Sequence, residues 1–172
     1  MTLSDDSLGL LTASDALTGA QAVARGVARM FLRHDVLLLP EVGLRNRRRA
    51  DLIGIDGKGQ IVIVEIKVAR SDLLGDRKWV EYLEYCDRFY WALPTGFDAS
   101  PVNGDEFLPD RTGLIIADAY DAEMVRPAAT SALAPARRKT ETMRLARRAM
   151  RRAAIADGWI SPDALVHESG AY

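Results

Sequence analysis

The stretch Ile61-Val62-Ile63-Val64-Glu65-Ile66-Lys67 decides the fold class of this chain of 172 residues. Its first four residues are all apolar, which is typical of a strand buried on both faces within a sheet. Because side chains alternate along a strand, Glu65 and Lys67 then point to the same face. A carboxylate and an ammonium group at the end of such a strand cost desolvation free energy unless other groups compensate. A structural salt bridge at the strand's edge is the alternative interpretation, and a functional role for the pair is favoured over it.

An aspartate on the preceding strand favours a functional interpretation. If Gly57-Lys58-Gly59 forms a three-residue hairpin loop, Asp51 lies opposite Glu65. Neighbouring strands are about 4.8 Å apart, so the two carboxylates can share one cation. A four-residue loop would shift the pairing by one residue and remove this alignment unless a bulge restored it. The register is therefore a prediction that a structure can test.

Hydrophobic periodicity and turn residues predict the remaining elements around this hairpin. A first helix is expected from Ser14 to Arg33, and a second from Ser71 or Asp76 to Asp87. The other expected elements are strands at 36–44, 50–55, 60–68 and 89–93, a loop at 95–111, a hairpin formed by 112–117 and 123–126, and a helix at 135–156. This order predicts an α/β fold: an αβββαβ core followed by a β-hairpin and a long basic C-terminal helix.

Length and composition predict a single domain in a reducing compartment. Residues 1–13 are expected to be a flexible tail, 14–157 the domain and 158–172 a second tail. No apolar run approaches the roughly 20 residues that a membrane span needs, and the N-terminus lacks signal-peptide features. The single cysteine, Cys86, cannot form an internal disulfide. A cytoplasmic location without a membrane partner is the resulting expectation.

The carboxylates define the expected chemistry. Asp51 and Glu65 offer oxygen ligands, which favour Mg²⁺ or Mn²⁺ over zinc. Cys86, His34 and His167 are scattered in the sequence and form no competing zinc set. A metal at Asp51 and Glu65 can activate a water for attack on a phosphodiester. Lys67 can stabilise the charge that develops on the phosphate or help to position the water.

Basic residues cluster although the net charge is only −1. Arg47, Arg48 and Arg49 directly precede Ala50-Asp51, and we expect phosphate contacts there rather than a plain solvated turn. Between 137 and 152 the chain has eight basic residues and one acidic residue, and an anionic ligand or acidic partner is favoured over a merely solvated face. The predicted DNA-binding residues are Arg47, Arg48, Arg49, Lys78, Arg144 and Arg148. For Lys78 an ordinary surface position is an equally good interpretation.

An aspartate on one strand and Glu-x-Lys on the next, between flanking helices, resembles the PD-(D/E)XK nuclease superfamily, with its restriction-endonuclease-like core. A longer similarity is more specific. The segments 48–51, 63–67, 76–82, 85–87, 112–119 and 136–139 resemble the MmcB family of DNA repair proteins, over about residues 20 to 150. This resemblance implies the nuclease-like fold and a role in DNA repair, without establishing that the chain cuts DNA.

Two departures from the superfamily pattern leave alternatives open. Ala50 replaces the proline before Asp51, and the first helix has Gln21 and Arg25 where many relatives place a glutamate. Glu41 is a candidate for the third carboxylate and is included among the predicted catalytic residues with Asp51, Glu65 and Lys67. The leading hypothesis is a metal-dependent DNA nuclease. The alternatives are a catalytically inactive DNA-binding or adaptor module with a repair-protein partner and a nuclease that acts on RNA. A homodimer is compatible with each.

Overall fold

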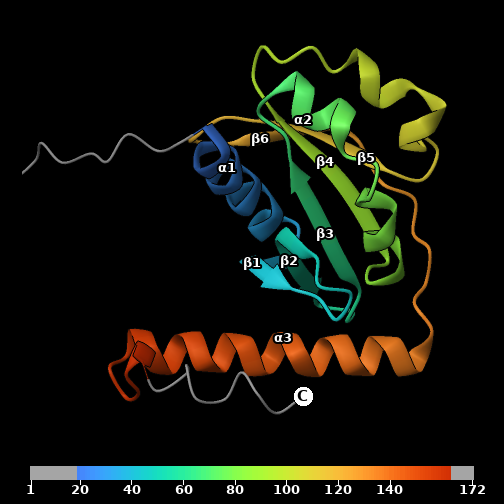
Figure 1. Ribbon diagram of the computed structural model, residues 1–172. Coiled ribbons are helices and arrows are strands. Elements are labelled where there is room, and N and C mark those ends of the chain that lie inside the picture. The colour runs from blue at the N-terminus through green and yellow to red at the C-terminus, as the bar shows by residue number, and fades with distance from the viewer. Residues whose placement is uncertain (1–18, 164–172) are drawn as a thin grey trace, which may run out of the picture.

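The computed structural model describes residues 19–163, which form a six-stranded mixed sheet flanked by helices (Figure 1). The strands are neighbours in the sheet in the order in which they follow one another in the chain. The strands are β1 (Val36–Gly43), β2 (Arg49–Asp56), β3 (Ile61–Ile66), β4 (Arg88–Pro94), β5 (Gly113–Ala117) and β6 (Ala122–Arg126). Pairing is antiparallel from β1 to β3, parallel from β3 to β5 and antiparallel between β5 and β6. The predicted mixed α/β class is thus confirmed.

Helix α1 (Gly19–Arg33) covers one face of the sheet (Figure 1). Its buried side chains recur every three or four residues and meet apolar side chains of β2, β3 and β4. Gly26 permits this close packing, because a Cβ there would lie 2.2 Å from the carbonyl oxygen of Asp118. The expected start of the helix at Ser14, like the predicted tail at 1–13, lies outside the described residues.

The segment after β3 corrects the sequence prediction of one continuous second helix. Helix α2 (Arg70–Gly75) ends early, and a separate 3-10 helix, η1 (Trp79–Glu84), follows it. Asp76 explains the break: its carboxylate accepts hydrogen bonds from the Lys78 backbone N–H and the Lys67 ammonium. Such local side-chain bonds compete with helical ones. Trp79 is 3% exposed and packs in the core.

Residues 95–111, predicted as a loop, contain two short 3-10 helices, η2 (Ser100–Asn103) and η3 (Asp105–Phe107). Their buried residues, Val102 and Phe107, join the core cluster on the sheet face opposite α1. The ring of Phe107 meets that of Trp91 edge-on at a centroid distance of 5.5 Å. Residues 95–111 therefore cover part of the sheet with an aromatic cluster that η1 extends.

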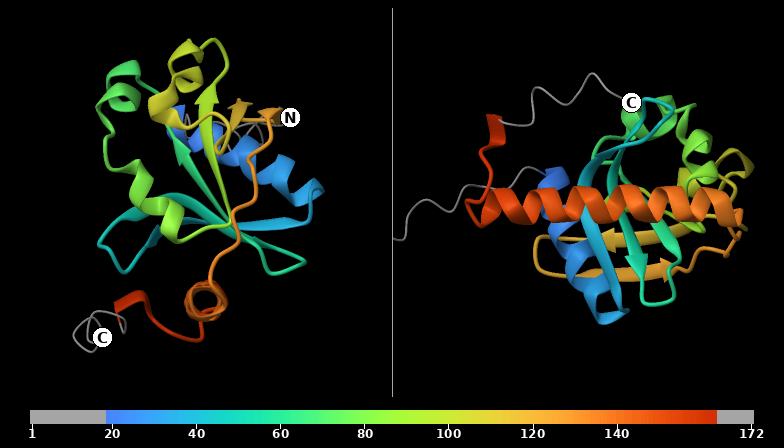
Figure 2. Two further views of the ribbon diagram at one scale, coloured as in Figure 1. Left: turned by 90° about the vertical axis from the view of Figure 1, so that its right-hand side faces the viewer. Right: turned by 90° about the horizontal axis from the view of Figure 1, so that it is seen from below.

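Helix α3 (Pro135–Ala156) has the predicted bounds and runs past the end of the sheet that carries β1 and β2 (Figures 1 and 2). Arg138, in its first turns, makes a bidentate ion pair with Asp87, which is 2% exposed. Further along, Leu145 is the helix's apolar contribution to the core. Among the described residues, no helix is both long and apolar enough to cross a bilayer.

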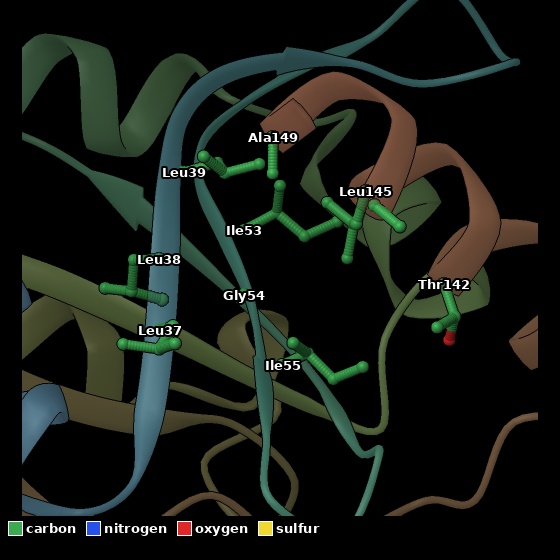
Figure 3. A pocket seen from close by; sticks show the side chains of 10 residues that line it. Leu37, Leu38, Leu39, Ile53, Gly54, Ile55, Thr142, Leu145 and Ala149 are labelled. Carbon is green, nitrogen blue, oxygen red and sulfur yellow. The ribbon is translucent and has the colours of Figure 1, made fainter. Parts of the chain in front are cut away.

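An apolar cavity of about 340 Å³ separates the middle of α3 from β1 and β2 (Figure 3). Leu39 and Ile53 of the sheet point towards Leu145 and Ala149 of the helix. No titratable side chain lines this cavity, so it does not have the composition of a catalytic site.

Candidate active site

The β2–β3 hairpin has the register that the sequence predicts. Leu52 pairs with Val64 and Ile55 with Ile61, so the next pair outward would be Asp51 and Glu65. Asp56 closes the three-residue loop, because its N–H donates to the Gln60 carbonyl and its carboxylate accepts the Gln60 N–H. Gly59 supplies the left-handed residue that such a loop needs, with φ of +79°.

Next to the last regular pair, a carboxylate on each strand accepts a hydrogen bond from a backbone N–H of the other strand. The Asp51 N–H donates to Glu65 Oε1 at 3.2 Å, and the Ile66 N–H donates to Asp51 Oδ2 at 2.8 Å. Regular pairing stops one residue earlier, at Leu52 and Val64. Each carboxylate therefore uses one oxygen to hold the neighbouring strand, and its other oxygen, Asp51 Oδ1 or Glu65 Oε2, accepts no backbone N–H.

Lys67 lies between two carboxylates at the end of β3. Its ammonium nitrogen is 3.7 Å from Glu65 Oε2 and 2.7 Å from Asp76 Oδ2. Burial alone would lower the pKa of Lys67, but the hydrogen bond to Asp76 and the charge of Glu65 outweigh burial and raise it. The lysine therefore stays protonated at physiological pH. Asp76 is the residue of this cluster that sequence reasoning missed, since its position suggested only a helix cap.

Glu65 is 4% exposed, and burial raises its pKa to about 8. The negative charge of Asp51 adds to this shift, whereas Lys67 opposes it. Burial also raises the pKa of Asp51, against the N–H of Ile66 and the charge of Lys67. The site thus holds two carboxyl groups and a lysine whose pKa values are all raised above their ordinary values.

Asp51 opens onto a cavity of about 370 Å³ between α1 and β1. Gln21 of α1 and Glu41 of β1 line the same cavity, so both candidate positions for a third ligand lie beside Asp51. Glu65 is not among the lining residues. Glu41 has a left-handed backbone, with φ of +51°, and its carboxylate is 3.7 Å from the Arg49 guanidinium. The catalytic role predicted for Glu41 therefore stays a prediction.

The carboxylates fit a cation that keeps much of its water. Two carboxylates with water and a substrate phosphate are a common shell for Mg²⁺. Within residues 19–163, no three His, Cys, Asp or Glu side chains converge in the arrangement of a metal site. The chain thus offers Asp51 and Glu65 as ligands rather than a complete protein cage.

The predicted DNA-binding residues near Asp51 differ in their surroundings. Arg47, with φ of +65°, and Lys78 are exposed. Arg48 makes a bidentate ion pair with Glu81 at 2.9 and 3.0 Å, which gives it a structural partner. Arg49 is exposed and faces Glu41. Arg47 and Arg49 therefore have more freedom than Arg48 to meet a phosphate.

The arginines of α3 reach across to the edge strand. Arg144 donates to the Gly43 carbonyl at 2.6 Å and Arg148 to the Glu41 carbonyl at 3.3 Å. Arg152, which the sequence analysis did not single out, donates to the Pro40 carbonyl at 2.6 Å. Their four-residue spacing was visible in the sequence, but the strand they would meet was not. Each guanidinium has further N–H groups, so a phosphate contact remains sterically compatible with these bonds.

These elements define a class: a mixed α/β protein that gathers two carboxylates and a lysine where β2 and β3 cease to pair. Comparison with known proteins gives the family. The model of the family described as DNA repair protein MmcB-like matches residues 11–158, so the chain belongs to the MmcB-like family of DNA repair proteins. A solved structure of a protein of unknown function from Silicibacter pomeroyi is 43% identical, covering 83% of this chain and 93% of that chain, with a TM-score of 0.73. A search of curated proteins finds no match.

Proposed function

We propose that this chain is a metal-dependent nuclease of the PD-(D/E)XK type that hydrolyses DNA phosphodiesters during repair. The observation that carries the proposal is the pair of hydrogen bonds across the ends of β2 and β3, from the Asp51 N–H to the Glu65 carboxylate and from the Ile66 N–H to the Asp51 carboxylate. The Lys67 ammonium lies 3.7 Å from Glu65 Oε2. The MmcB-like family supports the DNA repair context.

Asp51 and Glu65 would hold Mg²⁺ or Mn²⁺ through the oxygens that do not bond backbone amides. The cation, when bound, supplies Lewis acidity to a phosphate oxygen and lowers the pKa of a bound water. Lys67 keeps its proton and stabilises negative charge on the phosphate. Asp76 positions Lys67 through the 2.7 Å hydrogen bond. Arg47 and Arg49 bind flanking phosphates at the rim of the site.

A catalytically inactive DNA-binding or adaptor module is the second candidate. The observation that favours it is Gln21, which lines the Asp51 cavity from α1. An amide there is a weaker cation ligand than a carboxylate. Glu41 lines the same cavity and would supply the missing charge in the nuclease. The two functions thus differ in whether Glu41 completes the site.

The purified full-length protein should be incubated with branched, single-stranded and duplex DNA, with Mg²⁺, with Mn²⁺ and with chelator. We expect cleavage only with metal, and its loss in Asp51→Asn, Glu65→Gln and Lys67→Met. Glu123→Gln is the matched control, because Glu123 is an exposed glutamate on β6. Glu41→Gln tests the third ligand and should slow cleavage.

Two results would decide against the nuclease. If wild type and Glu65→Gln cleave equally, the activity belongs to a contaminant or to another site. If neither cleaves any substrate but both bind DNA, with affinity that falls as salt rises, the protein is the inactive binding module. A parallel reaction with single-stranded RNA separates a DNA nuclease from one that acts on RNA.

A further inference from the structure

Trp159 lies directly after α3 and is 80% exposed. Its backbone is nevertheless fixed: the Trp159 N–H donates to the Ala154 carbonyl at 2.8 Å, and the Gly158 N–H donates to the Ile155 carbonyl at 3.0 Å. Gly158 has φ of +73°, so these bonds form a Schellman cap. A large indole is thus held in solvent at an ordered helix end, although its exposure forgoes the free energy that burial would give.

From its middle towards this end, α3 has a row of arginines at Arg144, Arg148 and Arg152. Successive members are four residues apart, which is about 6 Å along the helix axis. Among the described residues, Arg144 pairs with Glu141, but Arg148 and Arg152 have no carboxylate within ion-pair distance. Burial, then the positive charges of Arg152, Arg151 and Arg144, lower the pKa of Arg148. The row therefore repels itself, and an anionic partner would relieve the repulsion.

This row lies beside the candidate active site. Arg148 and Arg152 bond the carbonyls of Glu41 and Pro40, and both of those residues line the cavity that contains Asp51. Trp159 follows Arg152 by seven residues, and its backbone bonds Ala154, two residues past Arg152. The Asp51 cavity therefore lies beside the Arg148 and Arg152 end of the row, which is also the end nearer to the exposed indole in the chain.

We propose that Arg144, Arg148, Arg152 and Trp159 form a binding track for single-stranded DNA, in which the arginines contact phosphates and Trp159 stacks on an unpaired base. This inference rests on the proposed function and specifies its substrate class: DNA with a single-stranded segment at the site. A charged row with an aromatic stacking residue is the usual arrangement for strands read without sequence preference.

Single-stranded DNA fits Trp159 better than duplex DNA, because base faces inside a duplex are covered by their neighbours. A membrane surface is the competing partner for a basic helix next to a tryptophan. The solvent side of α3 argues against it, because its exposed large apolar residues, Met143 and Met150, are interspersed with Arg147 and Arg151. Two methionines with small alanines between them expose little apolar area for insertion into a bilayer.

Tryptophan fluorescence tests the track directly. The chain has three tryptophans, and Trp79 and Trp91 are 3% and 0% exposed, so a ligand at the surface should change the emission of Trp159. The full chain should be titrated in chelator with a single-stranded thymidine oligomer, a closed DNA dumbbell without ends, a uridine oligomer and vesicles containing anionic lipid. Chelator separates binding from cleavage, so a failure of the nuclease proposal would leave this measurement valid.

The single strand should quench Trp159 and bind at least about tenfold more tightly than the closed dumbbell. In anisotropy measurements with a labelled strand, Trp159→Ala should weaken affinity about tenfold, whereas Trp159→Phe should retain most of it. Arg148→Ala and Arg152→Ala should each weaken binding and reduce its salt dependence. Arg147→Ala is the matched control, because Arg147 is an exposed arginine of the same helix outside the row.

Unchanged affinity in Trp159→Ala, or equal affinity for the strand and the dumbbell, would overturn the track. A blue shift on vesicles without any response to DNA would reassign the surface to membranes. Equal affinity for the uridine oligomer would overturn the assignment to DNA. Circular dichroism of each variant establishes that it remains folded.

Discussion

The Asp51 backbone N–H donates to Glu65 Oε1 at 3.2 Å, so one candidate ligand bonds the strand that carries the other. The Ile66 N–H returns a bond to Asp51 Oδ2 at 2.8 Å. The two carboxyl groups therefore serve structure and the proposed chemistry at once. Replacement of either side chain changes both, and measurements of stability are needed beside measurements of cleavage.

Glu65 should make stability fall as pH rises. Its pKa is raised from the ordinary 4.5 to about 8, so the folded protein keeps a proton that the unfolded chain loses. The stabilisation is complete below about pH 4.5 and is lost as pH rises through about 8. Each pKa unit corresponds to about 1.4 kcal/mol, so a few kcal/mol are at stake.

Urea denaturation of wild type and Glu65→Gln from pH 5 to pH 9, with chelator present, measures this effect. The difference in unfolding free energy should shift in favour of Glu65→Gln with increasing pH. Glu123→Gln, an exposed control, should keep the wild-type profile. Parallel profiles for wild type and Glu65→Gln would show that Glu65 is already ionised in the folded protein.

Metal binding should release a proton at neutral pH. A cation at Asp51 and Glu65 requires an ionised Glu65, whose pKa is about 8 without metal. Mn²⁺ affinity should therefore increase up to about pH 8 and then level off. Calorimetry in buffers of different ionisation enthalpy counts the protons released. Unchanged Mn²⁺ affinity in the Asp51→Asn, Glu65→Gln double variant would place the metal elsewhere.

The hairpin and its carboxylates were predictable because they depend on local rules. Two glycines around Lys58 specify a three-residue loop, and the loop determines which residue faces Glu65. The resemblance to the MmcB family, which includes the segment Ile63–Lys67, is confirmed by the family model that matches residues 11–158. Alternation along a strand then places charged groups without knowledge of the rest of the fold.

Contacts between distant segments were not predictable. Asp76 breaks the expected second helix because it takes the Lys67 ammonium, and the periodicity of 71–87 contains no sign of that bond. The α3 arginines likewise meet carbonyls about 100 residues away, at Gly43 and Glu41. Sequence periodicity places such side chains on a helix face but does not say what that face meets.

Asp87 should anchor α3 to the body of the protein. Burial alone would raise the pKa of Asp87, but the Arg138 guanidinium and the N–H groups of Ile61 and Leu133 outweigh burial and lower it. Asp87→Asn removes the charge that faces Arg138, so we expect destabilisation of about 2–3 kcal/mol. Hydrogen exchange should also quicken in α3. Glu84→Gln, at an exposed position nearby, is the control, and equal α3 protection in both variants would refute the anchor.

The α3 arginines should contribute to DNA affinity through phosphates. Each phosphate contact adds about 0.9 to the slope of log affinity against log salt for duplex DNA and about 0.7 for a single strand. Replacing Arg144 and Arg148 by alanine should therefore flatten the slope by up to about 1.8 or 1.4, and Mn²⁺ binding should persist. Glu65→Gln should instead abolish cleavage. DNA binding should survive or tighten in this variant, because a carboxyl next to the phosphates is removed. If the double variant keeps the wild-type slope, the guanidinium groups of Arg144 and Arg148 in the wild type bond only the β1 carbonyls, and the DNA binds elsewhere.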